Sequence, residues 1–93
     1  MDSIDALLAA LRAAAEPTRL RLLALAARGA FCVVELTEIL GQSQPRLSRH
    51  LKLLCDAGLL ERAREGANAW FTIAPGAAGA LARDLLARLP EDD

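Results

Sequence analysis

The residues best suited to chemistry lie between positions 43 and 52, on one predicted helix. Arg, Gln, Ser and Lys side chains reach base edges and phosphates when a helix lies in the major groove of DNA. At about 100° per residue, most of these side chains point away from a stripe of Leu47, Leu51 and Leu54. An ordinary solvated helix face has a similar composition, so the neighbouring elements must decide between the two interpretations. The candidate residues are Ser43, Gln44, Pro45, Arg46, Ser48, Arg49, His50 and Lys52.

These candidates divide by their position on the helix. Residues at its start and on its outer face are expected at base edges or close to them: Ser43, Gln44, Ser48 and Arg49. Residues more on the side of the DNA backbone are expected to contact phosphates: Arg46, His50 and Lys52. His50 is the only histidine of the chain and is not a metal site by itself, so we interpret it as part of this helix.

A short helix and a tight turn precede these residues. Val34, Leu36, Ile39 and Leu40 recur at helical spacing, and Gly41 can adopt the positive φ that ends a helix. The serine and proline that follow are typical of an N-cap and a first helical turn. Residues 34–57 are therefore predicted to form a helix-turn-helix.

A basic β-hairpin is predicted directly afterwards, over residues 59–73, with its turn at residues 65–68. Side chains alternate along a strand, so Arg62 and Arg64 lie on the same side of the outgoing strand. A wing in this position would place them at phosphates or in the minor groove, which adds both to the DNA-binding candidates. Trp70 is interpreted as a packing group, because lone aromatics in returning strands usually belong to the core.

Three further helices complete the predicted architecture. The first, over residues 4–15, is apolar on more than one side, which indicates a surface for a partner. The second begins at Pro17, ends at Gly29 and is expected to bury Leu20, Leu23, Ala24 and Ala27. The last covers residues 77–89 and ends before Pro90. The fold class is therefore mainly α with a small β-hairpin: a winged helix-turn-helix of five helices plus a wing, in one domain over residues 1–93.

Length and composition exclude several classes of protein. The 93 residues form one domain, and a chain of this size buries so little surface that a homodimer is favourable. Its hydrophobic fraction of 54% argues against disorder, and no run of about 18 apolar residues predicts a membrane span. The acidic N terminus does not resemble a secretory signal, so a cytoplasmic location is expected. One histidine and two separated cysteines provide no nucleophile–base pair and no metal cluster, which argues against an enzyme and predicts no cofactor.

The net charge of −1 argues against a generally polycationic DNA-binding domain, because freestanding ones are usually strongly basic. Between positions 42 and 66, however, five basic residues stand against three acidic ones, whereas an acidic run ends the chain at Glu91, Asp92 and Asp93. DNA binding is therefore expected to be focused and sensitive to salt.

The ordered set of motifs resembles the ArsR/SmtB family of winged-helix repressors. The similarity covers roughly residues 4 to 75 and rests on Glu16–Leu23, Glu35–Gly41, Ser43–Leu51, Ala57–Leu60, Arg64–Gly66 and Trp70–Phe71. The resemblance implies a homodimer in which the first and last helices, residues 4–15 and 77–89, pair between subunits. It also implies a repressor that binds double-stranded operator DNA until a small effector releases it.

The resemblance does not identify the effector. One site of the family uses two cysteines that flank a valine; here the stretch is Cys32-Val33-Val34, so the second thiol is missing. A metalloid or soft metal needs about three or four donors. Another family site uses histidine and acidic ligands on the last helix, which here contains only Asp84. We therefore predict no metal site, and Cys32 remains an alternative candidate for sensing thiol-reactive species or metalloids.

A second alternative comes from a further resemblance. The helix-turn-helix, Cys55 and the ending from Leu85 to Asp93 are similar to the N-terminal domain of longer proteins that continue into an S-adenosylmethionine-dependent methyltransferase. In that case the chain would be a dimerisation or docking module without a DNA function of its own.

Overall fold

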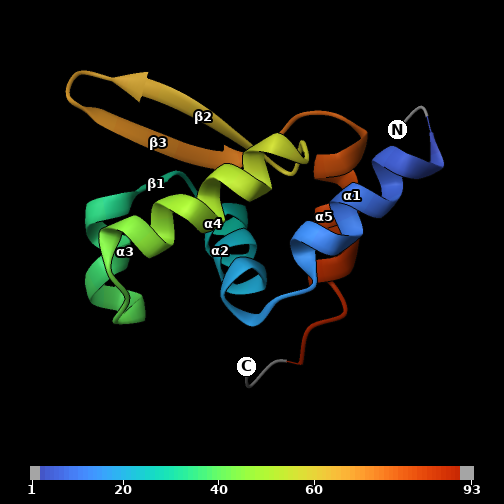
Figure 1. The fold of residues 1–93 in the computed structure, drawn as a ribbon, viewed down its shortest axis with the longest axis horizontal. Helices are drawn as coiled ribbons and strands as arrows, with labels where there is room; N and C mark the ends of the chain where they lie inside the picture. Colours follow the sequence, from blue (N-terminus) through green and yellow to red (C-terminus); the bar gives the residue numbers. More distant parts are fainter. Residues whose placement is uncertain (1–2, 91–93) are drawn as a thin grey trace.

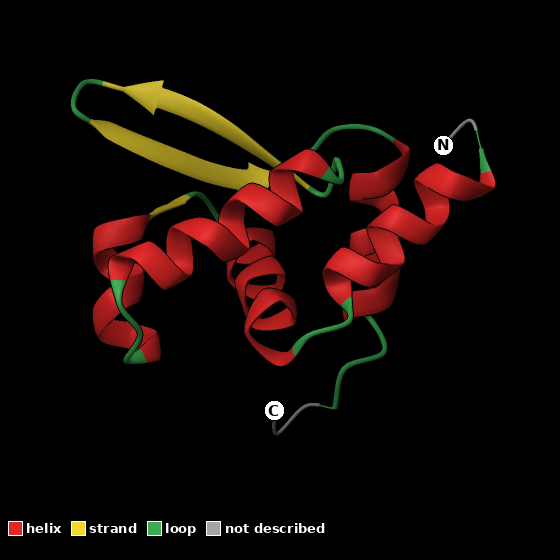
Figure 2. Ribbon diagram, viewed as in Figure 1, coloured by secondary structure: helices red, strands yellow, loops and turns green. Residues whose placement is uncertain are grey.

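The computed structural model describes residues 3–90, which form five α-helices and a three-stranded antiparallel sheet (Figures 1 and 2). In chain order the elements are α1 (Ile4–Ala14), α2 (Pro17–Arg28), β1 (Phe31–Cys32), α3 (Val33–Leu40), α4 (Gln44–Asp56), β2 (Leu60–Glu65), β3 (Asn68–Ile73) and α5 (Ala77–Leu86). The winged helix-turn-helix architecture expected from the sequence is confirmed. In Figure 1, α4 crosses in front of α2, α1 and α5 lie together at one end, and the hairpin of β2 and β3 extends toward the other.

Side chains near the helix starts explain where α1 and α2 begin. The Ser3 hydroxyl accepts a hydrogen bond from the Ala6 amide at 3.1 Å, so Ser3 is the N-cap of α1. The helix α2 is capped by the Glu16 carboxylate, which accepts from the Arg19 amide at 2.8 Å, and Pro17 occupies the first turn as predicted.

The buried face of α2 differs from the prediction. Its buried residues are Thr18, Leu22, Leu23 and Ala26, so of the four expected residues only Leu23 is fully buried. Leu20 and Ala24 are half-buried, and Ala27 is exposed. The reason is that α2 packs against α4, β3 and α5 at once, which a single apolar stripe does not predict.

The helix-turn-helix forms from local signals. Gly41 ends α3 with φ of 63°, a left-handed conformation that glycine adopts without steric penalty. The Ser43 hydroxyl then accepts from the Arg46 amide at 3.4 Å and caps α4. Leu47, Leu51 and Leu54 are buried, so the predicted leucine stripe of α4 faces the core.

The sheet contains one strand more than the predicted hairpin. The two-residue strand β1 pairs antiparallel with β3, which gives the strand order β1-β3-β2. The rings of Phe31 and Phe71 stack across this pairing, with 5.8 Å between their centroids. The aromatic residues buried in the core are therefore Phe31 and Phe71, whereas Trp70 is only half-buried.

The last helix is shorter than predicted. It ends at Leu86 instead of position 89, and Leu89 lies beyond it, half-buried. Close packing at its start explains the glycine at position 79, because a Cβ there would lie 1.7 Å from the Ala74 carbonyl oxygen. Within residues 3–90, no helix has the length and apolar character needed to cross a membrane.

Candidate nucleic-acid interface

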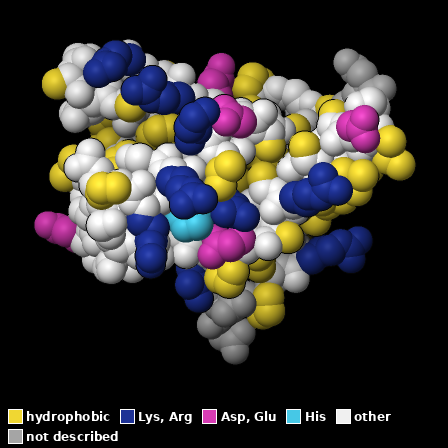
Figure 3. Space-filling model, viewed as in Figure 1, with side chains coloured by type: hydrophobic (Ala, Val, Ile, Leu, Met, Phe, Trp, Pro, Cys, Tyr) yellow, Lys and Arg dark blue, Asp and Glu magenta, His cyan; other side chains and the backbone are white. Residues whose placement is uncertain are grey.

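The outer face of α4 is solvent-exposed along its whole length. Inward-facing leucines fix the rotation of the helix, and this rotation leaves seven of the eight candidates of the turn and helix exposed: Ser43, Gln44, Pro45, Arg46, Ser48, Arg49 and Lys52. Lys and Arg side chains gather over α4 and the hairpin on the face shown in Figure 3, with individual acidic side chains beside them. The arrangement presents polar and cationic groups along one continuous side of the molecule.

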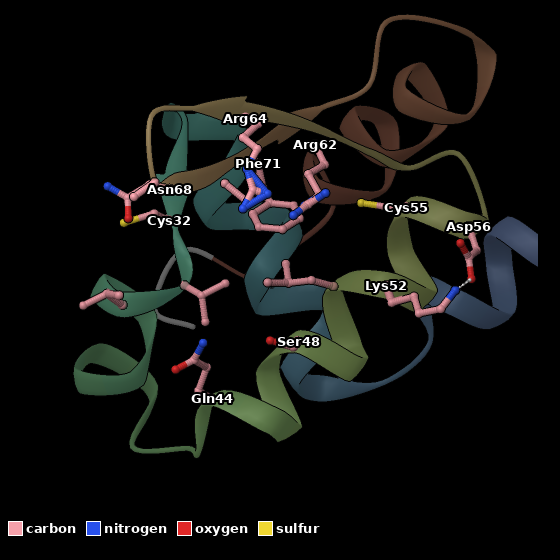
Figure 4. Close-up of a pocket in the computed structure, with 15 residues that line it drawn as sticks. Cys32, Gln44, Ser48, Lys52, Cys55, Asp56, Arg62, Arg64, Asn68 and Phe71 are labelled. Atoms are coloured by element: carbon pink, nitrogen blue, oxygen red, sulfur yellow. Dashed lines mark hydrogen bonds and ion pairs between the residues drawn. The ribbon is translucent and has the colours of Figure 1, made fainter.

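A cleft of about 540 Å³ separates α4 from the hairpin; we call it the wing cleft. Gln44, Ser48 and Lys52 line it from α4, and Arg62 and Arg64 line it from β2 (Figure 4). Five of the sequence-predicted residues are therefore brought together, although the two groups are ten positions apart at their nearest members, Lys52 and Arg62. A groove with amide, hydroxyl and cationic groups on its walls fits a strand of nucleic acid.

The register of the hairpin explains why the two arginines face this cleft. Arg62 is paired with Phe71, and Arg64 with Ala69, on the neighbouring strand β3. Directly opposed residues of an antiparallel pair have their side chains on the same face of the sheet. Because Phe71 faces the core, both arginines lie on the face of the hairpin that is turned toward α4, and both line the wing cleft.

Lys52 is the one cation of the wing cleft with an acidic partner among the described residues. Its ammonium donates to the Asp56 carboxylate at 2.9 Å, one helical turn further along α4. The two side chains are 74% and 62% exposed, so the pair contributes only about 0.3–0.5 kcal/mol. A phosphate oxygen can therefore replace Asp56 as the partner of Lys52 at little energetic cost.

The remaining basic candidates of α4 do not line the wing cleft. Arg46, Arg49 and His50 line a second cleft of about 410 Å³, together with Glu16 and other residues from the start of α2. His50 differs from the other candidates because it is half-buried, and its Nδ1 atom lies 3.2 Å from Nη1 of Arg19. The structure thus turns the imidazole toward α2 instead of into solvent.

The two cysteines lie on different sides of the wing cleft (Figure 4). Cys32 is buried at the start of α3, and its thiol donates to the Glu35 carboxylate at 3.2 Å. Burial raises the pKa of the half-buried Cys55 thiol, and the neighbouring charge of Asp56 raises it further, although Arg62 opposes the change. Among residues 3–90, no group of three or more His, Cys, Asp or Glu side chains is placed to hold a metal ion.

Sequence reasoning missed Asp56, Glu16 and Arg19 as neighbours of the candidate residues. The pairing of Lys52 with Asp56 carries a local signal, because residues four apart on a helix are neighbours. The contact between Arg19 and His50 spans 31 residues of chain, and no local pattern announces it.

An exposed polar helix that follows a tight turn and is flanked by a basic hairpin defines the winged helix-turn-helix class of DNA-binding domain. Residues 16–62 match the family described as "Bacterial regulatory protein, arsR family", and the chain belongs to this family.

Similarity to individual proteins extends beyond the matched segment. The chain is 45% identical over 62 residues to the arsenic resistance transcriptional regulator ArsR1 of Pseudomonas putida. The aligned segment covers 66% of this chain and 48% of the relative. It resembles the solved structure of HlyU from Vibrio cholerae, with a TM-score of 0.78, 28% identity and 91% and 94% of the two chains covered. It also resembles the homodimeric winged helix-turn-helix DNA-binding domain Mb0332 from Mycobacterium bovis, with a TM-score of 0.82, 27% identity and coverage of 90% and 78%. The chain spans about half the length of the first curated relatives that it matches.

Proposed function

We propose that this chain is a sequence-specific, DNA-binding transcriptional repressor that acts as a homodimer on double-stranded operator DNA in the cytoplasm, without catalytic activity. The observation that carries the proposal is the wing cleft, in which base-reading groups of α4 face the arginines of β2. Membership of the ArsR family supports it, as does the name of the Pseudomonas putida relative, which describes a transcriptional regulator.

The proposed contacts follow from the position of each side chain. We assign reading of base edges to the exposed polar groups at the start and on the outer face of α4, namely Ser43, Gln44, Ser48 and Arg49. We assign phosphate contacts to Arg46 and Lys52 on α4 and to Arg62 and Arg64 on the wing. Pro45 contributes shape to the first turn of α4, because it has no N–H to donate.

The proposed dimer interface is formed by α1 and α5. Ile4 is 72% exposed, and Leu8 and Leu11 are each 37% exposed, so α1 presents apolar surface that one subunit does not cover. This surface adjoins α5, because the two helices pack against each other. In a dimer that reads successive major grooves, the two α4 helices lie about 34 Å apart, which predicts a pseudo-palindromic operator.

Release of the repressor by a small effector is part of the proposal. Cys32 remains the candidate thiol of the alternative sensing function, and its burial and hydrogen bond to Glu35 describe a protected group. A reagent would therefore have to displace the Glu35 carboxylate before it reached the sulfur.

Fluorescence anisotropy tests the proposal. The homodimer is titrated into labelled DNA from upstream of its own gene and into a scrambled duplex, at 50 and 200 mM salt. We expect selective binding that weakens steeply with salt. Equal, weak binding to both duplexes would refute it and favour the docking-module alternative.

A further inference from the structure

Three side chains connect the helices α1, α2 and α4; we call Glu16, Arg19 and His50 the Arg19 cluster. Arg19 Nε donates to the Ala13 carbonyl oxygen in the last turn of α1 at 2.6 Å, and its Nη1 lies 3.2 Å from His50 Nδ1 on α4. Glu16 Oε2 caps α2 and lies 3.8 Å from the same His50 nitrogen. One arginine thus connects the proposed dimerisation helix to the proposed recognition helix.

The chemistry of these groups fixes the protonation state of the imidazole in this arrangement. A guanidinium group only donates hydrogen bonds, so His50 Nδ1 must accept with its lone pair, and the ring proton lies on Nε2. The carboxylate of Glu16, at 3.8 Å, is too far from Nδ1 for a hydrogen bond. Nδ1 therefore interacts with Arg19 and not with Glu16 when the ring is neutral.

Protonation reverses this preference. A protonated Nδ1 donates and no longer accepts, so the hydrogen bond from Arg19 is lost and two positive groups face each other. Glu16 then becomes the favourable partner, because a shorter distance would give it a charge-assisted hydrogen bond. The same atom of His50 thus has a different favourable partner in each protonation state.

Glu16 is the one acidic residue in the lining of the second cleft, where His50 lies. Arg19 faces the imidazole from α2, and Arg46 and Arg49 line the same cleft from α4, with Glu16 as its acidic member. Burial raises the pKa of Glu16, but hydrogen bonds from the Arg19 and Thr18 amides and the nearby positive charges lower it more, so the net pKa lies below its usual range. Glu16 therefore keeps its negative charge to a lower pH than an ordinary glutamate does.

We propose that His50 is a positioning residue: as a neutral acceptor for Arg19 it holds α4 in its DNA-reading orientation relative to α1, and protonation releases this hold. The proposal rests on the proposed function, because it assigns α1 to the dimer interface and α4 to the major groove. Since the two recognition helices of a dimer must match the spacing of the half-sites, a change at this joint alters sequence selectivity more than general affinity.

Nuclear magnetic resonance of the imidazole nitrogens in the full chain tests the contact without DNA. At pH 8 we expect Nδ1 to be the unprotonated, hydrogen-bonded nitrogen and Nε2 to carry the proton. Arg19→Lys should shift the Nδ1 resonance, because a lysine cannot contact Ala13 and His50 together. Arg21→Lys, the same substitution at an exposed position of α2, is the matched control and should leave that resonance unchanged. A neutral ring with its proton on Nδ1 would overturn the proposal.

DNA binding tests the consequence. The measured quantity is the ratio of dissociation constants for scrambled and operator duplexes at pH 7.5 and at pH 5.5. For the wild type we expect this ratio to fall about fivefold or more on acidification, the size of one net hydrogen bond. His50→Gln should remove this dependence, Arg19→Lys should lower the ratio at both pH values, and Arg21→Lys should behave as the wild type.

The outcomes separate the two hypotheses. Equal pH dependence in the wild type and His50→Gln would overturn the positioning role while leaving the repressor function intact. No selective binding by the wild type at pH 7.5 would overturn the proposed function and the positioning role with it. In that case the nitrogen resonances would still show whether His50 accepts from Arg19, so the failure would be traced to the DNA step.

Discussion

Replacing Lys52 tests how the DNA backbone is bound. Its ammonium is shared with Asp56 in an exposed pair that contributes only about 0.3–0.5 kcal/mol. A phosphate releases a counterion when a cation neutralises it, and each such contact contributes about 0.9 to the slope of log affinity against log salt. Lys52→Gln in a homodimer removes two contacts, so the slope should flatten by about 1.8.

The expected change in the salt slope is large enough to measure. Between 50 and 200 mM salt, a difference of about 1.8 in slope means that the wild type loses about twelvefold more affinity than the variant. Anisotropy titrations at four salt concentrations give the slope directly. The loss should be similar on operator and scrambled duplexes, because phosphates carry no sequence information.

Two further variants make the test specific. Arg28→Gln removes the same charge from an exposed position at the end of α2, away from the wing cleft, and should leave the slope unchanged. Asp56→Asn removes the competing carboxylate and should raise affinity at low salt. An unchanged slope in Lys52→Gln, together with unchanged affinity in Asp56→Asn, would refute the assignment of Lys52 to the backbone.

Three other predictions concern separate parts of the molecule. Arg49→Ala removes an exposed group that we assign to base reading and should cost about 1–3 kcal/mol of discrimination, measured as the loss of preference for operator over scrambled DNA. Gly79→Ala places a Cβ 1.7 Å from the Ala74 carbonyl oxygen and should lower the free energy of unfolding by about 1–3 kcal/mol, measured in urea at fixed protein concentration. The control Ala80→Gly, on the exposed side of α5, should change it only by helix propensity, about 1 kcal/mol. Burial raises the pKa of Cys55, so alkylation of this thiol at pH 8 should be slower than that of a free thiol and should accelerate as the pH rises. Mass spectrometry measures the rate, and a rate equal to that of a free thiol at pH 8 would contradict the prediction.

The parts of the fold that could be predicted from sequence are those with local signals. Gly41 and Ser43 mark the turn of the helix-turn-helix through backbone conformation and capping, and both act within a few residues of chain. The leucine stripe of α4 predicted the rotation of this helix, because one apolar face can only be buried in one way. The exposure of most interface candidates followed from that rotation.

The parts that could not be predicted depend on distant partners. The strand β1 has two residues, and its existence depends on pairing with β3, about forty residues further along the chain. The apolar spacing of the last helix continues to Leu89, but the helix ends at Leu86, because spacing does not report where packing stops. The orientation of His50 depends on Arg19 and Glu16, which belong to another helix.

Under the proposed function, the charge pattern of the candidate interface is compatible with DNA selection by a chain whose net charge is −1. Among residues 3–90, the ion pairs involve Lys52 with Asp56, and His50 with Glu16 when the histidine is protonated. Both acids accompany residues on the flanks of α4, whereas the exposed Arg49, which lines the same cleft as Glu16, lies in neither ion pair. Acidic groups beside the flanks weaken attraction to any duplex, while contacts with the correct bases are retained. A repressor must find its operator among a large excess of other sites. Weaker binding to non-operator DNA therefore raises the ratio of specific to non-specific affinity without any additional base contact.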